Sequence, residues 1–363
     1  MYLKALLPRY MNKQTKATTM KRLLLSCLVA ATAIGCQAVD GSTLKVKMDC
    51  KNVGDTIMVI GHNPKAQKPD AFVGKQGVFS FEVPLSQVGN LILAEPGAFR
   101  GDHSAAVFRI PGVPGEEAVL TAADGSRYDV TGSTFYAQYH EADLAIEEAQ
   151  KEKKDETETI LDFIKAHPDY EASAAIILML GDYDAMKQAT DLLAPAVRDG
   201  RFKTVCEHAL SQAEARKKAD EESAKKQAAG IKAPNFTLND LDGKPLSLES
   251  LRGKYVILDF WGSWCVWCIK GIPQMKEYYT KYQGKFEILG IDCNDTDEKW
   301  RDAVKKHELP WLHVYNPRES SVLKDYGIQG FPTKIIVGPD GKIVKTIVGE
   351  DPQFYTLLDE LFK

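Results

Sequence analysis

Cysteine is scarce in this chain: seven occur among 363 residues, and only one pair is close in sequence. A small secreted domain that depends on disulfides carries many more cysteines at short spacings. Long apolar runs are missing too. No stretch approaches the roughly 20 apolar residues that a membrane-spanning helix needs. The sequence therefore predicts neither a disulfide-stapled mini-protein nor a helical membrane protein.

An excess of positive charge is also absent. The chain has 46 Lys and Arg against 50 Asp and Glu, a net charge of −4. Six of the basic residues lie in the first 35, and without them the net charge is about −10. An acidic chain has no general attraction for nucleic acid or anionic lipid surfaces, so neither is a predicted partner. The composition is 44% hydrophobic and 26% charged, which at this length is typical of two or three globular domains.

Residues 1–35 have the pattern of an export signal. Lys21 and Arg22 precede an apolar segment, 23–34, that is too short to cross a bilayer. The tetrapeptide Ala-Ile-Gly-Cys that ends at Cys36 resembles a bacterial lipoprotein box, which implies cleavage before this cysteine and lipid attachment to its sulfur. The alternative is a plain secretory signal with a chance cysteine. We expect an exported, lipid-anchored protein in a compartment where disulfides persist.

The residue composition and hydrophobic pattern of the sequence change twice after the leader. Residues 36–134 show short alternating strands between Gly and Pro turns, which predicts a small β-sandwich. Residues 135–229 are rich in Ala, Glu, Lys and Leu and predict helices ending in a charged linker, with a dimerising coiled coil as the alternative. Residues 230–363 alternate strands and helices, which predicts an α/β domain. Its expected strands are 255–261, 286–292, 334–338 and 342–348, and its expected helices are 265–282, 297–307 and 352–362.

The most informative segment is Trp-Cys-Val-Trp-Cys at 264–268, between a predicted strand and a predicted helix. Two cysteines separated by two residues at such a turn are the working unit of thiol–disulfide exchange. Cys265 lies where the helix amides and dipole favour an anion, which stabilises its thiolate. Cys268 lies one turn further along, close enough to resolve a mixed disulfide.

The decapeptide at 259–268, Asp-Phe-Trp-Gly-Ser-Trp-Cys-Val-Trp-Cys, resembles the active-site segment of thioredoxin. Pro273 matches the proline that kinks the active-site helix of that family, and the segment 326–333 resembles the one that carries its cis-proline. The extended lead-in and the inserted helix at 297–307 resemble the TlpA/ResA branch of membrane-tethered thioredoxin-like proteins. The resemblance covers about 230–363. It implies a thioredoxin-like fold and thiol–disulfide oxidoreductase activity, without a cofactor.

The resemblance also implies roles for single residues. Cys265 is expected to be the exposed nucleophile and Cys268 the buried resolving thiol of one redox-active disulfide. Asp259 is the candidate base for Cys268, because burial on an apolar strand raises the pKa of a carboxyl group toward neutrality. The alternative for Asp259 is an acid on the strand surface. Pro332 is expected to be cis and to bring the backbone of Phe331 against the cysteines, where it pairs with an extended substrate.

Trp264, Trp267 and Phe331 are expected to line the substrate surface, with ordinary core packing as the alternative. Three departures from the family stand out. The TlpA/ResA branch often has Glu three residues after the second cysteine, where this chain has Gly271. Thioredoxin has a lysine near its aspartate, and by alignment that position is Ile288, so no such partner is expected. The Val-Trp dipeptide between the cysteines also differs from the common Gly-Pro or Pro-Pro, which leaves the direction of electron flow open.

The other cysteines are expected to be inert. Cys293 follows a predicted strand at the active-site edge, where a third redox thiol is the alternative to a buried packing residue. Cys50 and Cys206 lie in different predicted domains and are expected to be free buried thiols, with a disulfide between the two domains as the alternative. No metal site is predicted, because Cys293, His307 and His313 lack the paired spacing of zinc ligands.

Two other functional classes compete with this interpretation. A peroxidase of the peroxiredoxin kind would need Pro and Thr or Ser where the chain has Leu258 and Gly262. A scaffold lipoprotein whose front domains recruit a partner would not need the intact cysteine pair or Asp259. The sequence therefore predicts a periplasm-facing, lipid-anchored enzyme that reduces protein disulfides with electrons from a membrane donor. An oxidase or isomerase of the same fold is the alternative.

Overall fold

The computed structural model describes residues 43–61, 68–122 and 127–363. The expected leader and the lipid site at Cys36 lie outside these residues. The chain divides into two compact units, one ending at Ala215 and the other running from Arg216 to Lys363. No helix in the described ranges has the length and apolar character needed to cross a membrane.

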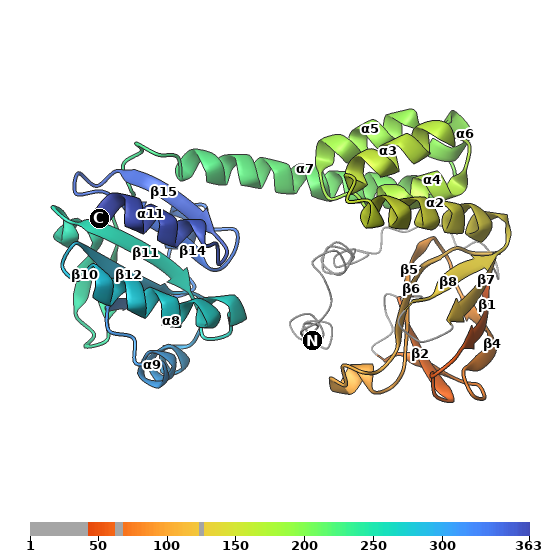
Figure 1. Ribbon diagram of the computed structural model, residues 1–363, viewed down its shortest axis with the longest axis horizontal. Helices are drawn as coiled ribbons and strands as arrows, with labels where there is room; N and C mark the ends of the chain where they lie inside the picture. Colours follow the sequence, from red (N-terminus) through yellow and green to blue (C-terminus); the bar gives the residue numbers. More distant parts are fainter. Residues whose placement is uncertain (1–42, 62–67, 123–126) are drawn as a thin grey trace. The chain divides into compact units, whose positions relative to one another are not determined.

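The first unit begins with two four-stranded sheets, in the orders β4-β1-β7-β8 and β3-β2-β5-β6 (Figure 1). Their strands are β1 (Thr43–Cys50), β2 (Thr56–Ile60), β3 (Asp70–Val73), β4 (Val78–Pro84), β5 (Gly89–Ala94), β6 (Val107–Gly112), β7 (Glu117–Ala122) and β8 (Asp129–Gly132), with a short 3₁₀ helix, η2 (Ala98–Arg100). Along β1 every second side chain is buried, as the period of two in a half-buried strand requires. Apolar side chains of both sheets share one core, which confirms the predicted β-rich domain.

Helices follow the sheets, also as predicted. They are α2 (Thr134–Lys151), α3 (Glu156–Ala166), α4 (Glu171–Ile177), α5 (Tyr183–Leu192), α6 (Pro195–Arg198) and α7 (Lys203–Lys226). Asp155 and Asp182 cap α3 and α5 by accepting hydrogen bonds from backbone amides of the first turn. Phe135 and Ile146 of α2 pack into the same core as the sheets. The charged linker is the end of α7, a helix that begins in the first unit and ends in the second (Figure 1).

The second unit is built on a seven-stranded sheet in the order β10-β9-β13-β12-β11-β14-β15. Its strands are β9 (Thr237–Asp240), β10 (Pro245–Ser247), β11 (Tyr255–Trp261), β12 (Phe286–Asp292), β13 (Leu312–Tyr315), β14 (Thr333–Val337) and β15 (Ile343–Val348). Its helices are η3 (Leu248–Leu251), α8 (Val266–Lys281), α9 (Asp297–Lys306), α10 (Val322–Asp325) and α11 (Gln353–Phe362). Strand β11 lies inside the sheet, parallel to β12 and antiparallel to β14.

The side chains of β11 alternate between two cores. Leu258 and Phe260 pack with residues of α10, whereas Ile257 packs with residues of α8 and α11. Because alternate residues of a strand point to opposite faces, Asp259 and Trp261 lie on the face of Ile257. The strand therefore delivers Asp259 to the buried layer beneath α8, which is the helix that carries the cysteine pair.

The predicted elements of this unit differ from the observed ones mainly at their ends. Helix α8 begins at Val266 because Cys265 is its N-cap, and β14 begins one residue earlier than expected. Strands β9, β10 and β13 are not among the expected strands, because three or four residues are too few to show an alternating pattern. The alternation of strands and helices around one sheet confirms the predicted α/β domain.

Candidate active site

Cys265 and Cys268 lie at the start of α8 and are joined by a disulfide, with their Cα atoms 5.3 Å apart. Cys265 has extended backbone angles as the N-cap of the helix, and the Cys268 amide donates to its Sγ atom at 3.2 Å. The free amides and the dipole of a helix N-terminus favour negative charge. The position of Cys265 therefore suits a thiolate when the disulfide is reduced.

Both sulfurs are covered in this state. Cys265 and Cys268 are each 5% exposed and pack in one cluster with Trp261, Trp300 and Phe331. The expectation that Cys265 is exposed is therefore wrong for the disulfide form. In the disulfide form, Cys265 packs among the aromatic side chains of this cluster.

Aromatic side chains stand around this covered disulfide. Trp264 and Trp267 are 50% and 44% exposed, whereas Trp261 is buried in the core. The Trp264 ring meets the Phe331 ring edge to face at 5.3 Å, and the ammonium of Lys270 lies 4.5 Å from the centre of the Trp267 ring. These two tryptophans form an exposed apolar rim next to the cysteines, as a surface that binds extended protein segments requires.

The loop after β12 holds the active-site loop in place. Asp295 accepts hydrogen bonds from the Ser263 amide and hydroxyl at 2.6 and 2.7 Å, and the Trp264 indole donates to the Cys293 carbonyl at 2.8 Å. Asp292 lies buried beside Asp295, and burial followed by this neighbour raises its pKa to about 8. Hydrogen bonds to the loop after β12 therefore hold Ser263 and Trp264, the two residues before Cys265, in place.

Cys293 itself is a packing thiol. It is fully buried, and its Sγ atom donates to the Ile291 carbonyl at 3.3 Å. Burial and the nearby carboxylates of Asp292 and Asp259 raise its pKa far above the usual range, so the thiol stays protonated and unreactive at neutral pH. Cys50 and Cys206 are also free and buried.

Asp259 is a buried carboxyl group beneath α8. It is 7% exposed, and its Oδ1 atom has no hydrogen-bond partner among the described residues. Burial raises its pKa to about 6, Lys334 lowers this pKa and Glu350 raises it. A carboxyl group with a pKa near 6 exchanges protons readily close to neutral pH, which is what a general base for a thiol needs.

The expectation that Asp259 lacks a lysine partner is wrong. Lys334 is directly opposite Asp259 in the antiparallel pair of β11 and β14. It is only 2% exposed. Ile288, the position that aligns with the thioredoxin lysine, lies on β12, on the other side of β11. A single lysine in the apolar strand Thr333–Val337, two residues after Pro332, is the signal that identifies it.

Glu350 brings a second carboxylate to this layer from the segment after β15. Its Oε2 atom lies 2.8 Å from the Lys334 ammonium, and its Oε1 atom accepts a hydrogen bond from the Tyr355 hydroxyl at 3.0 Å. The same hydroxyl lies 3.4 Å from the Gly271 carbonyl. A Cβ atom at Gly271 would lie 2.3 Å from Oε2 of Glu350. Glycine at 271 therefore leaves the space that this carboxylate fills.

Pro332, just before β14, has a cis peptide bond to Phe331. The Thr333 hydroxyl donates to the Gly330 carbonyl at 2.7 Å, and the Gly349 amide donates to the Pro332 carbonyl at 2.7 Å. The structure thus brings the Phe331–Pro332 segment, the cysteine pair and the exposed tryptophans to one end of the sheet. Asp259 lies in the layer below them.

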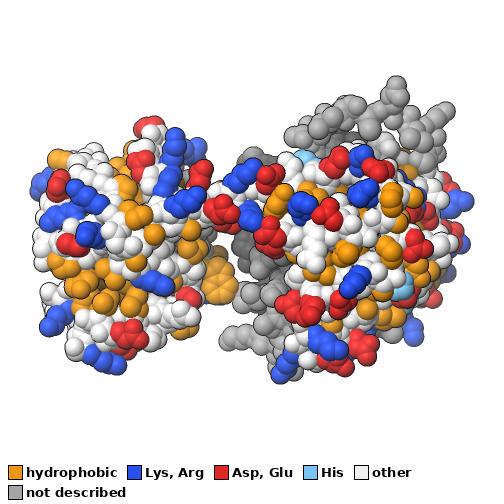
Figure 2. All heavy atoms as spheres, turned by 90° about the horizontal axis from the view of Figure 1, so that it is seen from above, with side chains coloured by type: hydrophobic (Ala, Val, Ile, Leu, Met, Phe, Trp, Pro, Cys, Tyr) orange, Lys and Arg blue, Asp and Glu red, His pale blue; other side chains and the backbone are white. Residues whose placement is uncertain are grey.

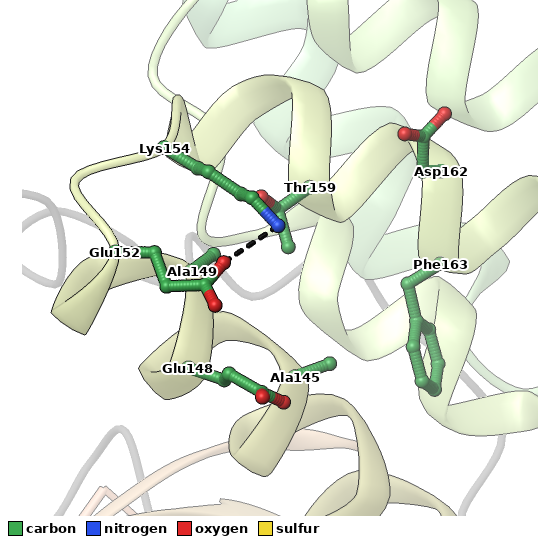
Figure 3. Close-up of a pocket in the computed structure, with 8 residues that line it drawn as sticks. All are labelled: Ala145, Glu148, Ala149, Glu152, Lys154, Thr159, Asp162 and Phe163. Atoms are coloured by element: carbon green, nitrogen blue, oxygen red, sulfur yellow. Dashed lines mark ion pairs between the residues drawn. The ribbon is translucent and has the colours of Figure 1, made fainter.

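Other parts of the described chain offer no comparable chemistry. A hollow of about 420 Å³ between α2 and α3 is lined by Ala145, Glu148, Ala149, Glu152, Lys154, Thr159, Asp162 and Phe163 (Figure 3). Its ion pair between Lys154 and Glu152 is exposed, and no thiol lines it. The described residues contain no group of three or more His, Cys, Asp or Glu side chains arranged to hold a metal ion. On the face shown in Figure 2, acidic and basic side chains are interspersed over both units.

Replacing Asp259 with Asn is expected to stabilise the disulfide form at neutral pH by roughly 3 kcal/mol at most. The folded pKa is about 6 against 3.8 for the ordinary group. The folded protein therefore binds the proton more tightly, and wild-type stability falls as pH rises through this window. Urea unfolding at several pH values measures the effect. The gain should vanish below pH 4 and be absent in Asp302→Asn, an exposed control on α9. A gain that does not change with pH would contradict the assignment.

Comparison with known proteins places the cysteine-bearing unit in context. The model of the AhpC/TSA family matches residues 229–346. The chain is 39% identical to the thiol-disulfide oxidoreductase ResA of Bacillus thuringiensis subsp. konkukian (strain 97-27) over 126 residues, which are 34% of this chain and 72% of that protein. For ResA of Bacillus subtilis (strain 168) the identity is 33% over 121 residues, which are 33% of this chain and 67% of that protein.

Solved structures give similar matches. The thioredoxin domain of a thiol-disulfide oxidoreductase from Bacteroides vulgatus is 34% identical, with a TM-score of 0.35, and the alignment covers 37% of this chain and 98% of that one. A thiol:disulfide interchange protein from Bacteroides sp. is 33% identical, with a TM-score of 0.36, and the alignment covers 38% of this chain and 91% of that one.

Proposed function

Because this chain belongs to the ResA-like thiol–disulfide oxidoreductases of the thioredoxin family, we propose that it is a membrane-tethered enzyme that reduces disulfides of exported proteins. The oxidoreductase class predicted from the sequence is confirmed by these relatives. The observation that carries the finer proposal is the Cys265–Cys268 pair at the N-terminus of α8, above the buried carboxyl of Asp259 and beside an exposed aromatic rim.

The chemistry of the proposed reaction follows from this geometry. The Cys265 thiolate attacks one sulfur of a substrate disulfide, which forms a mixed disulfide and releases the first substrate thiolate. Cys268, after giving its proton to Asp259, attacks the Cys265 sulfur, which restores the Cys265–Cys268 disulfide and releases the second thiolate. Two electrons pass from the enzyme to the substrate, whose two thiolates take up protons. A protein thiol or disulfide is therefore the expected substrate.

The proposed cellular setting rests on the sequence. A positively charged, apolar leader and the lipoprotein-like box at Cys36 support export and a lipid anchor. A reductase outside the cytosol has to recover two electrons after each cycle, so we propose a membrane protein as its electron donor. Processing at Cys36 is tested by mass spectrometry of the protein from a bacterial membrane fraction. A mature protein without lipid at this residue would exclude the anchor.

The reduction potential of the Cys265–Cys268 pair is expected to lie near −270 mV, the range of reducing thioredoxins. A low potential lets the dithiol pass electrons to the disulfides of other proteins. Equilibration with glutathione or dithiothreitol buffers measures it, and an insulin-reduction assay checks the activity. A potential near about −120 mV would make the protein an oxidant instead. A fully reducible pair without activity toward insulin or scrambled ribonuclease would favour the scaffold function.

A further inference from the structure

Lys334 and Glu350 form an ion pair beside the buried carboxyl group of Asp259. We propose that Glu350 is a positioning residue: it holds the ammonium of Lys334, so that the carboxylate of Asp259 stays available to accept the proton of Cys268. This inference rests on the proposed function, because it concerns the base in the resolving step. It assigns the task to a residue 82 positions after Cys268 in the sequence.

The ammonium of Lys334 lies near two carboxyl groups, those of Glu350 and Asp259, and pairs with only one of them. The strand register places Lys334 opposite Asp259, but its ammonium lies 2.8 Å from Glu350, and the Oδ1 atom of Asp259 has no hydrogen-bond partner among the described residues. The side chains of Lys334 and Glu350 are 2% and 18% exposed. Opposite charges at this distance attract strongly where water is excluded. One ammonium therefore faces two carboxyl groups and neutralises Glu350 most directly.

Further contacts keep the Glu350 carboxylate in this position. The Tyr355 hydroxyl donates to its Oε1 atom, and the Gly271 backbone of α8 passes so close that no side chain fits between them. A buried ion pair is costly to form unless its remaining hydrogen-bonding capacity is satisfied. Tyr355 satisfies the oxygen that Lys334 leaves free. The arrangement is thus a built pair and not an adventitious surface contact.

Titratable groups face Asp259 from each element packed around β11. They are Lys334 from β14, Cys293 after β12, Glu350 after β15 and Tyr355 from α11. Cys268 of α8 packs in one cluster with Trp261, two residues along β11 from Asp259. Cys293 and Tyr355 stay neutral near pH 7, because burial raises the pKa of each far above that range. Burial raises the pKa of Asp259 the most, and the charges of Lys334 and Glu350 then adjust it, Lys334 the more strongly.

The test follows one chemical step as a function of pH. The mixed disulfide between Cys265 and glutathione is prepared at acidic pH and jumped to higher pH, and the release of glutathione is timed. Asp259 must lose its proton to act as the base, so the rate rises through the pKa of Asp259. Glu350→Gln removes the competing carboxylate, which leaves the Lys334 charge to Asp259. The midpoint of the curve of rate against pH should therefore move down by roughly one pH unit.

Two more variants fix the order of the midpoints. Lys334→Met should move the midpoint up by roughly one pH unit, because a charge that favours the ionised carboxyl is lost. The double variant, Lys334→Met with Glu350→Gln, should fall between wild type and Lys334→Met, because the lysine acts more strongly on Asp259 than Glu350 does. It removes both charges of the ion pair together, so it should fold even where Glu350→Gln alone is unstable. Lys345→Met and Glu360→Gln, both exposed, are the matched controls and should follow wild type.

The possible outcomes distinguish the positioning role of Glu350 from the proposed oxidoreductase function. The order Glu350→Gln, wild type, double variant, Lys334→Met, from low to high midpoint, supports the positioning role. If Glu350→Gln lowers the rate at every pH without moving the midpoint, or the double variant coincides with wild type, the role is overturned and the oxidoreductase function stands. If the wild-type mixed disulfide releases no glutathione at any pH, the proposed function fails and the inference fails with it.

Discussion

Replacing Cys265 with Ser is expected to lower the rate of disulfide exchange by about three orders of magnitude or more. A thiolate is the nucleophile in this reaction, and a serine hydroxyl at the same N-cap is neither ionised near pH 7 nor able to form a disulfide. Reduction of insulin disulfides by the variant, compared with wild type at equal concentration, measures the loss. The fold should persist, because serine is a good N-cap and retains the hydrogen bond that Cys265 accepts.

Two cysteine variants serve as controls for this result. Cys206→Ser changes a buried thiol of the first unit, and Cys293→Ser changes one beside the active-site loop. Each serine can still donate to the carbonyl that the thiol contacts. Both variants should keep activity within about twofold of wild type. Substantial activity of Cys265→Ser would show that another group is the nucleophile, and a large loss in Cys293→Ser would make Cys293 a third redox thiol.

Replacing Cys268 with Ser is expected to stop the reaction at the mixed disulfide. Cys265 keeps its place at the N-terminus of α8 and still attacks a substrate, but no second thiol is left within reach to release it. With a disulfide-containing protein as substrate, the variant should accumulate one covalent adduct per chain. Mass spectrometry or a gel without reducing agent detects this adduct. Dithiothreitol should cleave it by reducing the mixed disulfide.

Specificity of the trap is checked with the double variant. Cys265→Ser combined with Cys268→Ser should form no adduct, because the attacking sulfur is gone. If Cys268→Ser turns over substrate at the wild-type rate, or if no adduct appears while Cys265 remains reactive, Cys268 is not the resolving thiol. An adduct on Cys293 instead would contradict its description as a buried, protonated thiol.

The cysteine motif and the fold of its unit are readable from local sequence. The spacing of Cys265 and Cys268 is a property of consecutive residues, and the apolar strand and helix around them show their periods within about 25 residues. Asp259 is conspicuous for the same reason, as the one charged residue in the strand Tyr255–Trp261. Their assigned roles in exchange stay predictions until the variants above are measured.

The environments of Asp259 and Cys265 depend on residues far away in the sequence, and local sequence patterns do not predict them. The thioredoxin lysine aligns with a position on β12, whereas the structure places Lys334 on β14, the opposite neighbour of β11. Which strands flank β11 follows from the pairing of the whole sheet, and a local pattern does not encode that pairing. The exposure of Cys265 was misjudged for a similar reason, because Trp300 of α9 and Phe331 come from segments that follow it by 35 and 66 residues.

The sequence by itself determined the reactive pair, the buried acid and the α/β order of the unit that carries them, because spacing and periodicity act over short distances along the chain. Only the tertiary structure decided which charges surround Asp259. Gly271 reads as a missing carboxylate in the sequence, but in the fold it makes room for Glu350. Electrostatic interactions depend on distance in space and on the exclusion of water, and both are set only when β11, β14, α8 and the segment after β15 pack together.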